Sequence, residues 1–97
     1  MYIEMSGSTL TELTKLTMAL RDKTGTCLNL DSDTLIPDFF HEVAVSRSPF
    51  IQRHALALWQ RMYDDNTGWR KRRELKKYKA YMLDLIELND SESIVAA

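Results

Sequence analysis

The sequence of 97 residues predicts a small all-α domain of about four helices. Apolar residues recur at spacings of three and four in four separate stretches, which is the period of one helix face. Capping residues, glycines and prolines separate these stretches, and strand signals are few. The length suits one domain at most. We assign residues 1–89 to a single helical domain and residues 90–97, which start polar and end in small apolar residues, to a flexible C-terminal tail.

The first helix is expected to start at Thr9 and to end near residues 22–24. Thr9 and Glu12 fit a capping box, in which each side chain satisfies a free backbone amide of the first turn. Gly25 suits the position that follows a helix. The leucines expected on the buried face are Leu10, Leu13, Leu16 and Leu20.

The second and third helices are predicted from their proline starts. Pro37 fits the first turn of a helix that runs to about Ser46, and Ser48 with Pro49 fits the start of a helix over about 49–64. We expect Trp59 on the flank of the buried stripe. The buried residues expected are Phe39, Phe40, Val43 and Ala44 in the second helix, and Ile51, Ala55, Leu58 and Met62 in the third.

The fourth helix is predicted over about 68–89, after the polar break at residues 64–68. It should be long, basic in its first half and acidic in its second. The apolar residues that recur at three and four positions along it are Leu75, Tyr78, Met82 and Leu85. This spacing predicts packing along much of its length.

The fourth helix also carries the strongest functional signal. Residues 69–79 contain seven Lys or Arg against Glu74 alone, a local charge of +6 in a chain of net charge -1. Such a concentration predicts a surface that binds something acidic. The candidate partner-binding residues are Trp69, Arg70, Lys71, Arg72, Arg73, Lys76, Lys77 and Lys79.

These charges oppose the helix dipole. Residues 70–73 place positive charge in the first turn, while Asp84, Glu87 and Asp90 place negative charge toward the far end. Each mismatch costs about 0.3–1 kcal/mol at an exposed site. A local rule broken repeatedly in one direction indicates a functional surface. We expect Glu74, through Arg70, and residues 64–65 to offset part of the charge.

Three interpretations of the basic segment stay open at this stage. The first is a solvated helix face that nearby acids balance. The second is a surface that anchors an acidic protein through its arginines, with Trp59 or Trp69. The third is a nucleic-acid site in which Trp69, Tyr78 or Tyr81 stacks on bases. No nucleic-acid-binding motif accompanies it, which favours the protein partner slightly.

We predict neither an enzyme nor a metal or cofactor site. Cys27, His41 and His54 lack paired ligand spacing. The sequence at Asp31 begins like a calcium loop, but Ile36 occupies the position that requires glycine. A single cysteine fits a reducing cytosol, and no apolar run approaches about 18 residues. We therefore expect a cytoplasmic protein without membrane contact.

One local pattern resembles a known family. Residues 55–59, Ala-Leu-Ala-Leu-Trp, are followed by Asn-Thr-Gly-Trp at 66–69 and by Arg73. This pattern is similar to that of the ANR family of small negative regulators of virulence transcription factors, over about twenty residues. The resemblance implies a small helical protein that acts by protein contact.

The size, helix content and lack of catalytic residues also resemble the small phage proteins that take over host machinery, such as the anti-RecBCD accessory proteins of lambdoid phages. That resemblance implies a protein in the bacterial host cytosol that modulates the RecBCD recombination nuclease. A small transcriptional regulator, which binds DNA or a transcription factor, is the alternative. A homodimer is compatible with either. Residues 94–97 are similar to C-terminal degradation signals.

Overall fold

Four helices form the fold, as predicted. The computed structural model describes the backbone of residues 2–96 and the side chains of residues 2–90. Within these residues the secondary structure is entirely helical, with no strand. The helices are α1 (Gly7–Thr24), α2 (Leu35–Val45), α3 (Pro49–Asp65) and α4 (Trp69–Ala96). The all-α class and the long last helix are thereby confirmed.

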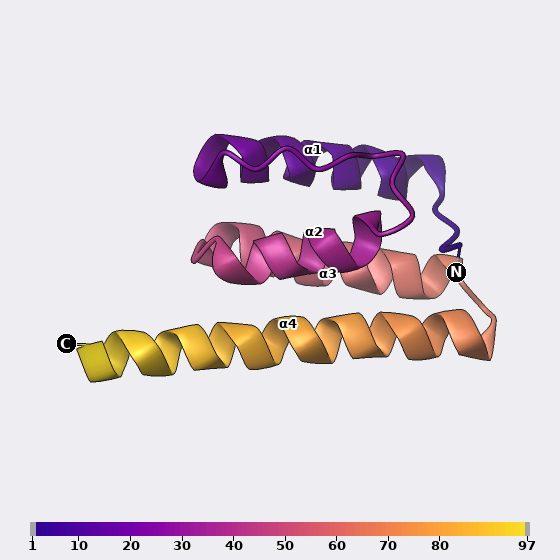
Figure 1. Cartoon of the computed structure of the whole chain (residues 1–97). Coiled ribbons are helices and arrows are strands. Elements are labelled where there is room, and N and C mark those ends of the chain that lie inside the picture. The colour runs from indigo at the N-terminus through magenta and orange to yellow at the C-terminus, as the bar shows by residue number, and fades with distance from the viewer. Residues whose placement is uncertain (1, 97) are drawn as a thin grey trace.

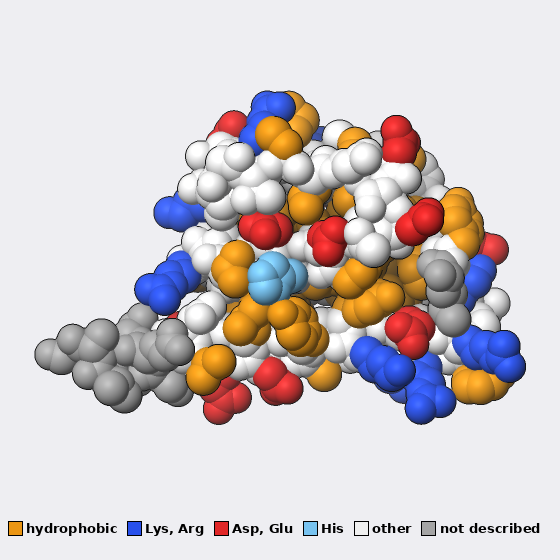
Figure 2. Space-filling model, viewed as in Figure 1, with side chains coloured by type: hydrophobic (Ala, Val, Ile, Leu, Met, Phe, Trp, Pro, Cys, Tyr) orange, Lys and Arg blue, Asp and Glu red, His pale blue; other side chains and the backbone are white. Residues whose placement is uncertain are grey.

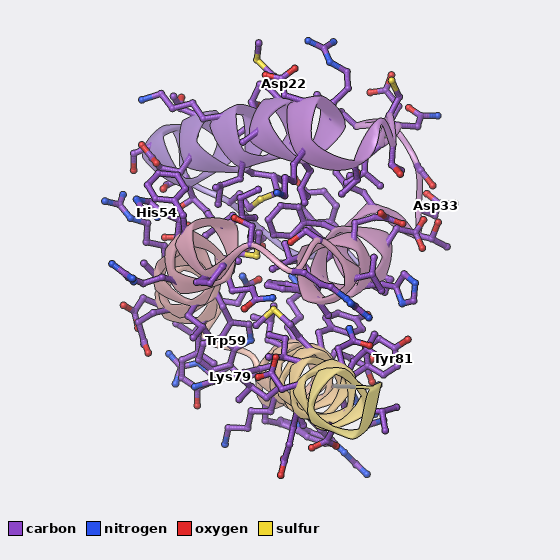
Figure 3. The ribbon with its side chains drawn as sticks, turned by 90° about the vertical axis from the view of Figure 1, so that its left-hand side faces the viewer. Asp22, Asp33, His54, Trp59, Lys79 and Tyr81 are labelled. Carbon is purple, nitrogen blue, oxygen red and sulfur yellow. The ribbon has the colours of Figure 1, made fainter. Side chains whose placement is uncertain are left out.

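The helices stack in three layers. Helices α2 and α3 lie side by side in the middle, α1 covers one face of this pair, and α4 lies along the opposite face (Figures 1 and 3). Helix α4 runs past the end of the other three, so the molecule is elongated, with extents of 43 × 27 × 21 Å. This arrangement leaves one long side of α4 facing solvent.

The start of α1 differs from the prediction. The N-cap is Ser6, whose hydroxyl accepts a hydrogen bond from the Thr9 amide at 3.3 Å. Thr9 lies inside the helix and is buried, and its hydroxyl donates to the Asp65 carboxylate at 2.7 Å. Leu10, which was expected on the buried face, lies beside it and is 47% exposed. Thr9 therefore joins α1 to α3 instead of capping its own helix.

The other helix ends follow their sequence signals. Gly25 ends α1 with φ of 78°, a left-handed conformation that suits glycine. Pro37 lies in the first turn of α2, and the Ser48 hydroxyl accepts from the Ile51 amide at the start of α3. These ends are set locally, which is why their residue types revealed them.

The core fills the space on both sides of the α2–α3 pair. Phe39 and Phe40 pack edge to face with ring centroids 5.1 Å apart, and both are fully buried. Every residue predicted to be buried in α2 and α3 is buried, and Trp59 is only 5% exposed. In α4, Leu75 and Met82 are fully buried, whereas Tyr78 and Leu85 are half-buried at the edge of the core.

Asn66 fastens the N-terminal segment to the end of α3. Its side chain is fully buried and donates to the carbonyls of Glu4 and Met62, at 2.8 and 2.7 Å, while it accepts from the Glu4 amide at 2.9 Å. Ile3 is thereby held in the core. A buried amide with all these partners is stable, because each polar atom regains the bond that it loses to water.

The helical backbone of α4 continues past the expected end at residue 89, to Ala96. Asp84 and Glu87 are consequently interior to α4, where the negative end of the dipole acts weakly. The dipole mismatch is thus confined to the basic first turn. The side chains of residues 91–97 lie outside the described part, so the flexible tail and the degradation signal at 94–97 stay predictions.

Candidate partner-binding surface on helix α4

Helix α4 lies over the seam between α2 and α3, and this position divides its side chains among four faces. Leu75 and Met82 point into the seam and are fully buried. Lys79 lies on the α3 side beside Trp59, and Tyr81 lies on the α2 side (Figure 3). The remaining side, opposite the buried residues, faces solvent. The basic residues fall on different faces and so have different roles.

The α3 side uses basic residues to cover two aromatic rings. Trp59 and Tyr63 stack with centroids 5.1 Å apart. The Lys79 ammonium lies 4.3 Å from the Trp59 centroid, and the Arg72 guanidinium lies 4.3 Å from that of Tyr63. Lys76 lies 5.8 Å from the same tyrosine ring. Cation–π contacts of this kind stabilise the packing of α4 on α3.

Arg72 has a second structural contact, since its Nε–H donates to the backbone carbonyl of Asn66. That carbonyl follows the last turn of α3, where no further helical amide is available. The guanidinium is half-buried. Of the predicted partner-binding residues, Arg72 is therefore the one most committed to the fold, and Lys79 follows it.

The acids near the basic segment have other partners than those expected. Glu74 binds Lys77 at 3.3 Å, not Arg70. The Asp64 carboxylate accepts a hydrogen bond from the side-chain amide of Gln60 at 3.1 Å. Asp65 accepts from the Ser6 amide at 2.9 Å and from Thr9, and these hydrogen bonds hold the pKa of its carboxyl below the usual range. Residues 64–65 are thus engaged elsewhere and leave the charge of α4 largely in place.

The solvent-facing start of α4 holds Trp69, Arg70 and Arg73. The Trp69 side chain is 67% exposed, and the Arg70 guanidinium lies 5.3 Å from its ring centroid. Neither arginine forms an ion pair with an acid among residues 2–90. Lys71, by contrast, binds Glu4 at 3.4 Å and leans toward the N-terminal segment. This end therefore presents two unoccupied guanidinium groups beside an exposed indole.

A groove lies on the α2 side of α4, beyond the exposed start of that helix. It is a cavity of about 390 Å³, and His41 and Tyr81 share a hydrogen bond of 2.8 Å across it. Burial raises the pKa of the Tyr78 phenol, and the neighbouring Glu74 adds to that rise. The lining residues are Pro37, Asp38, Phe40, His41, Lys77, Tyr78 and Tyr81.

Sequence reasoning missed this groove as a site. His41 and Tyr81 are forty positions apart, so no local spacing links them. Lys77 was predicted as a partner-binding residue, and it is the member of the set that lines the groove. On this face of the molecule, apolar side chains gather around a histidine, with basic side chains toward one end of α4 and acidic ones along its other half (Figure 2).

Other features of the described residues are less informative. A larger hollow of about 550 Å³ separates the N-terminal segment from the connector at Asp31 and Asp33. Among the residues that the structure describes, no three His, Cys, Asp or Glu side chains cluster as metal ligands would. Cys27 is an exposed free thiol. None of the helices in this part of the chain has an apolar stretch long enough to cross a bilayer.

The fold and this surface define a small four-helix protein with one basic, aromatic-lined face. No protein-family model matches the chain, and no curated protein or solved structure is significantly similar to it.

Proposed function

We propose that this protein is a non-enzymatic interaction protein that binds an acidic segment of a partner protein on the α2–α4 side. The observation that carries the proposal is the apolar groove at Tyr81, which opens beside the exposed cations of α4. An apolar side chain of the partner enters the groove, and carboxylates flanking it reach Lys77, Arg73 and Arg70. Aromatic pockets bordered by arginine are typical anchors of protein interfaces.

The charge pattern along α4 favours a protein over nucleic acid. From Arg70 to Lys77 the exposed basic stretch is about 10 Å long, at about 1.5 Å per residue. On the same side, Asp84 and Glu87 follow and are exposed. A phosphate backbone that continued along the helix would meet these carboxylates and be repelled. A short acidic peptide fits the basic stretch without reaching them.

The specific partner implied by the whole-chain resemblance is the RecBCD nuclease of the bacterial host, in the cytosol. This identity is tested with purified RecBCD against immobilised protein, at nanomolar concentration. We expect binding by the wild type and at least tenfold weaker binding by the double variant Arg70→Glu/Lys77→Glu. The matched control reverses two exposed charges elsewhere, Lys15→Glu/Arg53→Glu, and should bind as the wild type does.

A display library of acidic peptides with a single apolar residue tests the surface independently of that identity. Selected peptides should lose affinity with Tyr81→Ala and with Arg70→Glu/Lys77→Glu. If no peptide or RecBCD binds, and DNA binds tightly instead, the regulator alternative replaces the proposal. A salt series then counts the phosphates, because each contact adds about 0.9 to the slope of log affinity against log salt.

A further inference from the structure

The solvent-facing side of α4 carries one regular row of residues, which we call the outer row. Its members are spaced by four, three, four and three positions, which keeps them on one side of a helix. All are exposed, and they lie opposite the fully buried Leu75 and Met82. The outer row consists of Arg73, Lys77, Ala80, Asp84 and Glu87.

Along the outer row, side chains on the two sides of Ala80 carry opposite charge. Arg73 lies seven positions before Ala80 and Glu87 lies seven after it, so opposite charges are equidistant from the small central residue. The neighbouring residues follow the same rule. Lys76 and Asp84 lie four positions to either side, and Arg70 and Asp90 lie ten. All of these side chains are exposed.

We infer that a second copy of this chain packs antiparallel along the outer row, with the two-fold axis at Ala80. This arrangement places Arg73 beside Glu87 of the second copy and Lys77 beside Asp84 of the second copy. A two-fold axis makes each contact twice. A parallel arrangement would instead set Arg73 against Arg73 and Glu87 against Glu87, and like charges at close range oppose association. Charge complementarity therefore selects the antiparallel copy.

The centre and edge of the row suit close approach of two helices. Ala80 carries only a methyl group, so the helix axes can come near each other at the axis of symmetry. Leu83, which is 41% exposed at the edge of the row, lies beside Lys76 of the second copy. The methylene stem of a lysine covers apolar surface while its ammonium stays in water. The pairing thus buries an exposed leucine as well as matching charges.

The same pairing relieves the mismatch at the start of α4. Arg70 and Arg73 oppose the dipole of their own helix, and no acid among residues 2–90 binds them. Glu87 of the second copy supplies negative charge beside Arg73. Exposed ion pairs are individually weak and screened by salt. The dimer is consequently expected to be of micromolar affinity and to dissociate in high salt.

The dimer also occupies Arg73 and Lys77, so it competes with an acidic partner. This regulatory consequence rests on the proposed function, whereas the dimer itself does not. The two can fail separately, because the dimer is measured on the protein alone and partner binding at nanomolar concentration, where the chain is a monomer.

Sedimentation equilibrium of the full chain tests the dimer. At high micromolar concentration and low salt we expect twice the monomer mass of 11.3 kDa, and in 1 M NaCl we expect the monomer. Arg73→Glu and Glu87→Arg should each weaken the dimer at least tenfold, and the two together should restore it. Lys15→Glu, an exposed reversal on α1, should change nothing. A monomer at every concentration, or a double variant that is not restored, overturns the inference.

Cross-linking tests the direction of the helices. In a Cys27→Ser background, chains with Arg73→Cys are mixed with chains with Glu87→Cys and oxidised. The antiparallel pair predicts disulfides between the two kinds of chain. Disulfides within each kind alone would contradict it. Circular dichroism of each variant confirms that the helices are intact, so a loss of dimer is not read from an unfolded chain.

Discussion

The indole Nε1–H of Trp59 donates a 2.6 Å hydrogen bond to the backbone carbonyl of Leu75. Both residues are buried, and the bond joins the middle of α3 to the second turn of α4. The Lys79 ammonium covers the outer face of the same ring at 4.3 Å. Trp59 is therefore the residue through which α3 fixes the position and rotation of α4, and through it the faces that the basic residues occupy.

Trp59→Phe should destabilise the fold by about 2 kcal/mol. Phenylalanine keeps most of the apolar contact but loses the hydrogen bond to Leu75 and weakens the contact with Lys79. Urea unfolding followed by circular dichroism measures the change. The matched control is Tyr81→Phe, which removes only the exposed hydrogen bond to His41 and should cost below about 0.5 kcal/mol. Equal losses in the two variants would contradict the role given to Trp59.

Adjacent arginines should differ in their effect on stability. Arg72→Ala should cost about 2 kcal/mol, because it removes both the hydrogen bond to the Asn66 carbonyl and the cation over Tyr63. Arg73→Ala should change the free energy of unfolding by less than about 0.5 kcal/mol, since its side chain faces solvent. Thermal and urea unfolding of the two variants in parallel make the comparison. A larger loss at Arg73 would mean that the outer face is packed in solution.

Asp65 should make stability depend on acid pH. Its pKa is lower in the folded chain than the usual value of 3.8, so its contribution is complete above that value and is lost as pH falls through the folded pKa. The stability advantage of the wild type over Asp65→Asn should therefore shrink as pH falls below about 4. Unfolding curves from neutral pH to about pH 2 measure it. The control for the loss of one charge at this end of α3 is Asp64→Asn, which removes the carboxylate that accepts from the Gln60 side chain.

Gly25→Ala should cost about 1 kcal/mol. Gly25 has φ of 78°, and a β-carbon there is strained even though nothing lies within 4 Å of its position. Gly7→Ala is the matched control, because Gly7 is the first residue of α1 and its β-carbon site is also open. That variant should keep or slightly raise the stability. A thermal shift of the same sign and size for both would show that strain at Gly25 is not the cause.

Local sequence signals predicted much of the fold but failed where a partner came from elsewhere in the chain. Ser48, Pro49 and Gly25 act within one turn, and their predicted positions are confirmed. Thr9 was wrong as a cap, because its hydroxyl is used by Asp65, fifty-six positions away. The helical backbone of α4 also continues past the predicted end at residue 89. The polar residues after Asn89 can remain helical, and their composition alone did not place the boundary.

The sequence predicted the segment that carries the candidate site, but not which of its residues face solvent. The basic residues of α4 are evident in the sequence, but nothing local shows that Arg72 and Lys79 serve the fold while Arg70 and Arg73 face solvent. The groove beside Tyr81 was not predicted at all, because its second wall is α2. Whether the exposed residues bind a partner is a prediction that the experiments above decide.

The amino-acid sequence by itself determined the four helices, their apolar stripes and the concentration of positive charge in α4. These follow from the periodicity, capping and composition of short stretches. Only the tertiary structure decided which positive charges are free. The reason is physical: charge belongs to a residue, whereas exposure depends on how α4 is rotated in the seam between α2 and α3. That rotation is set by contacts such as Trp59 with Leu75, which join residues distant in the chain.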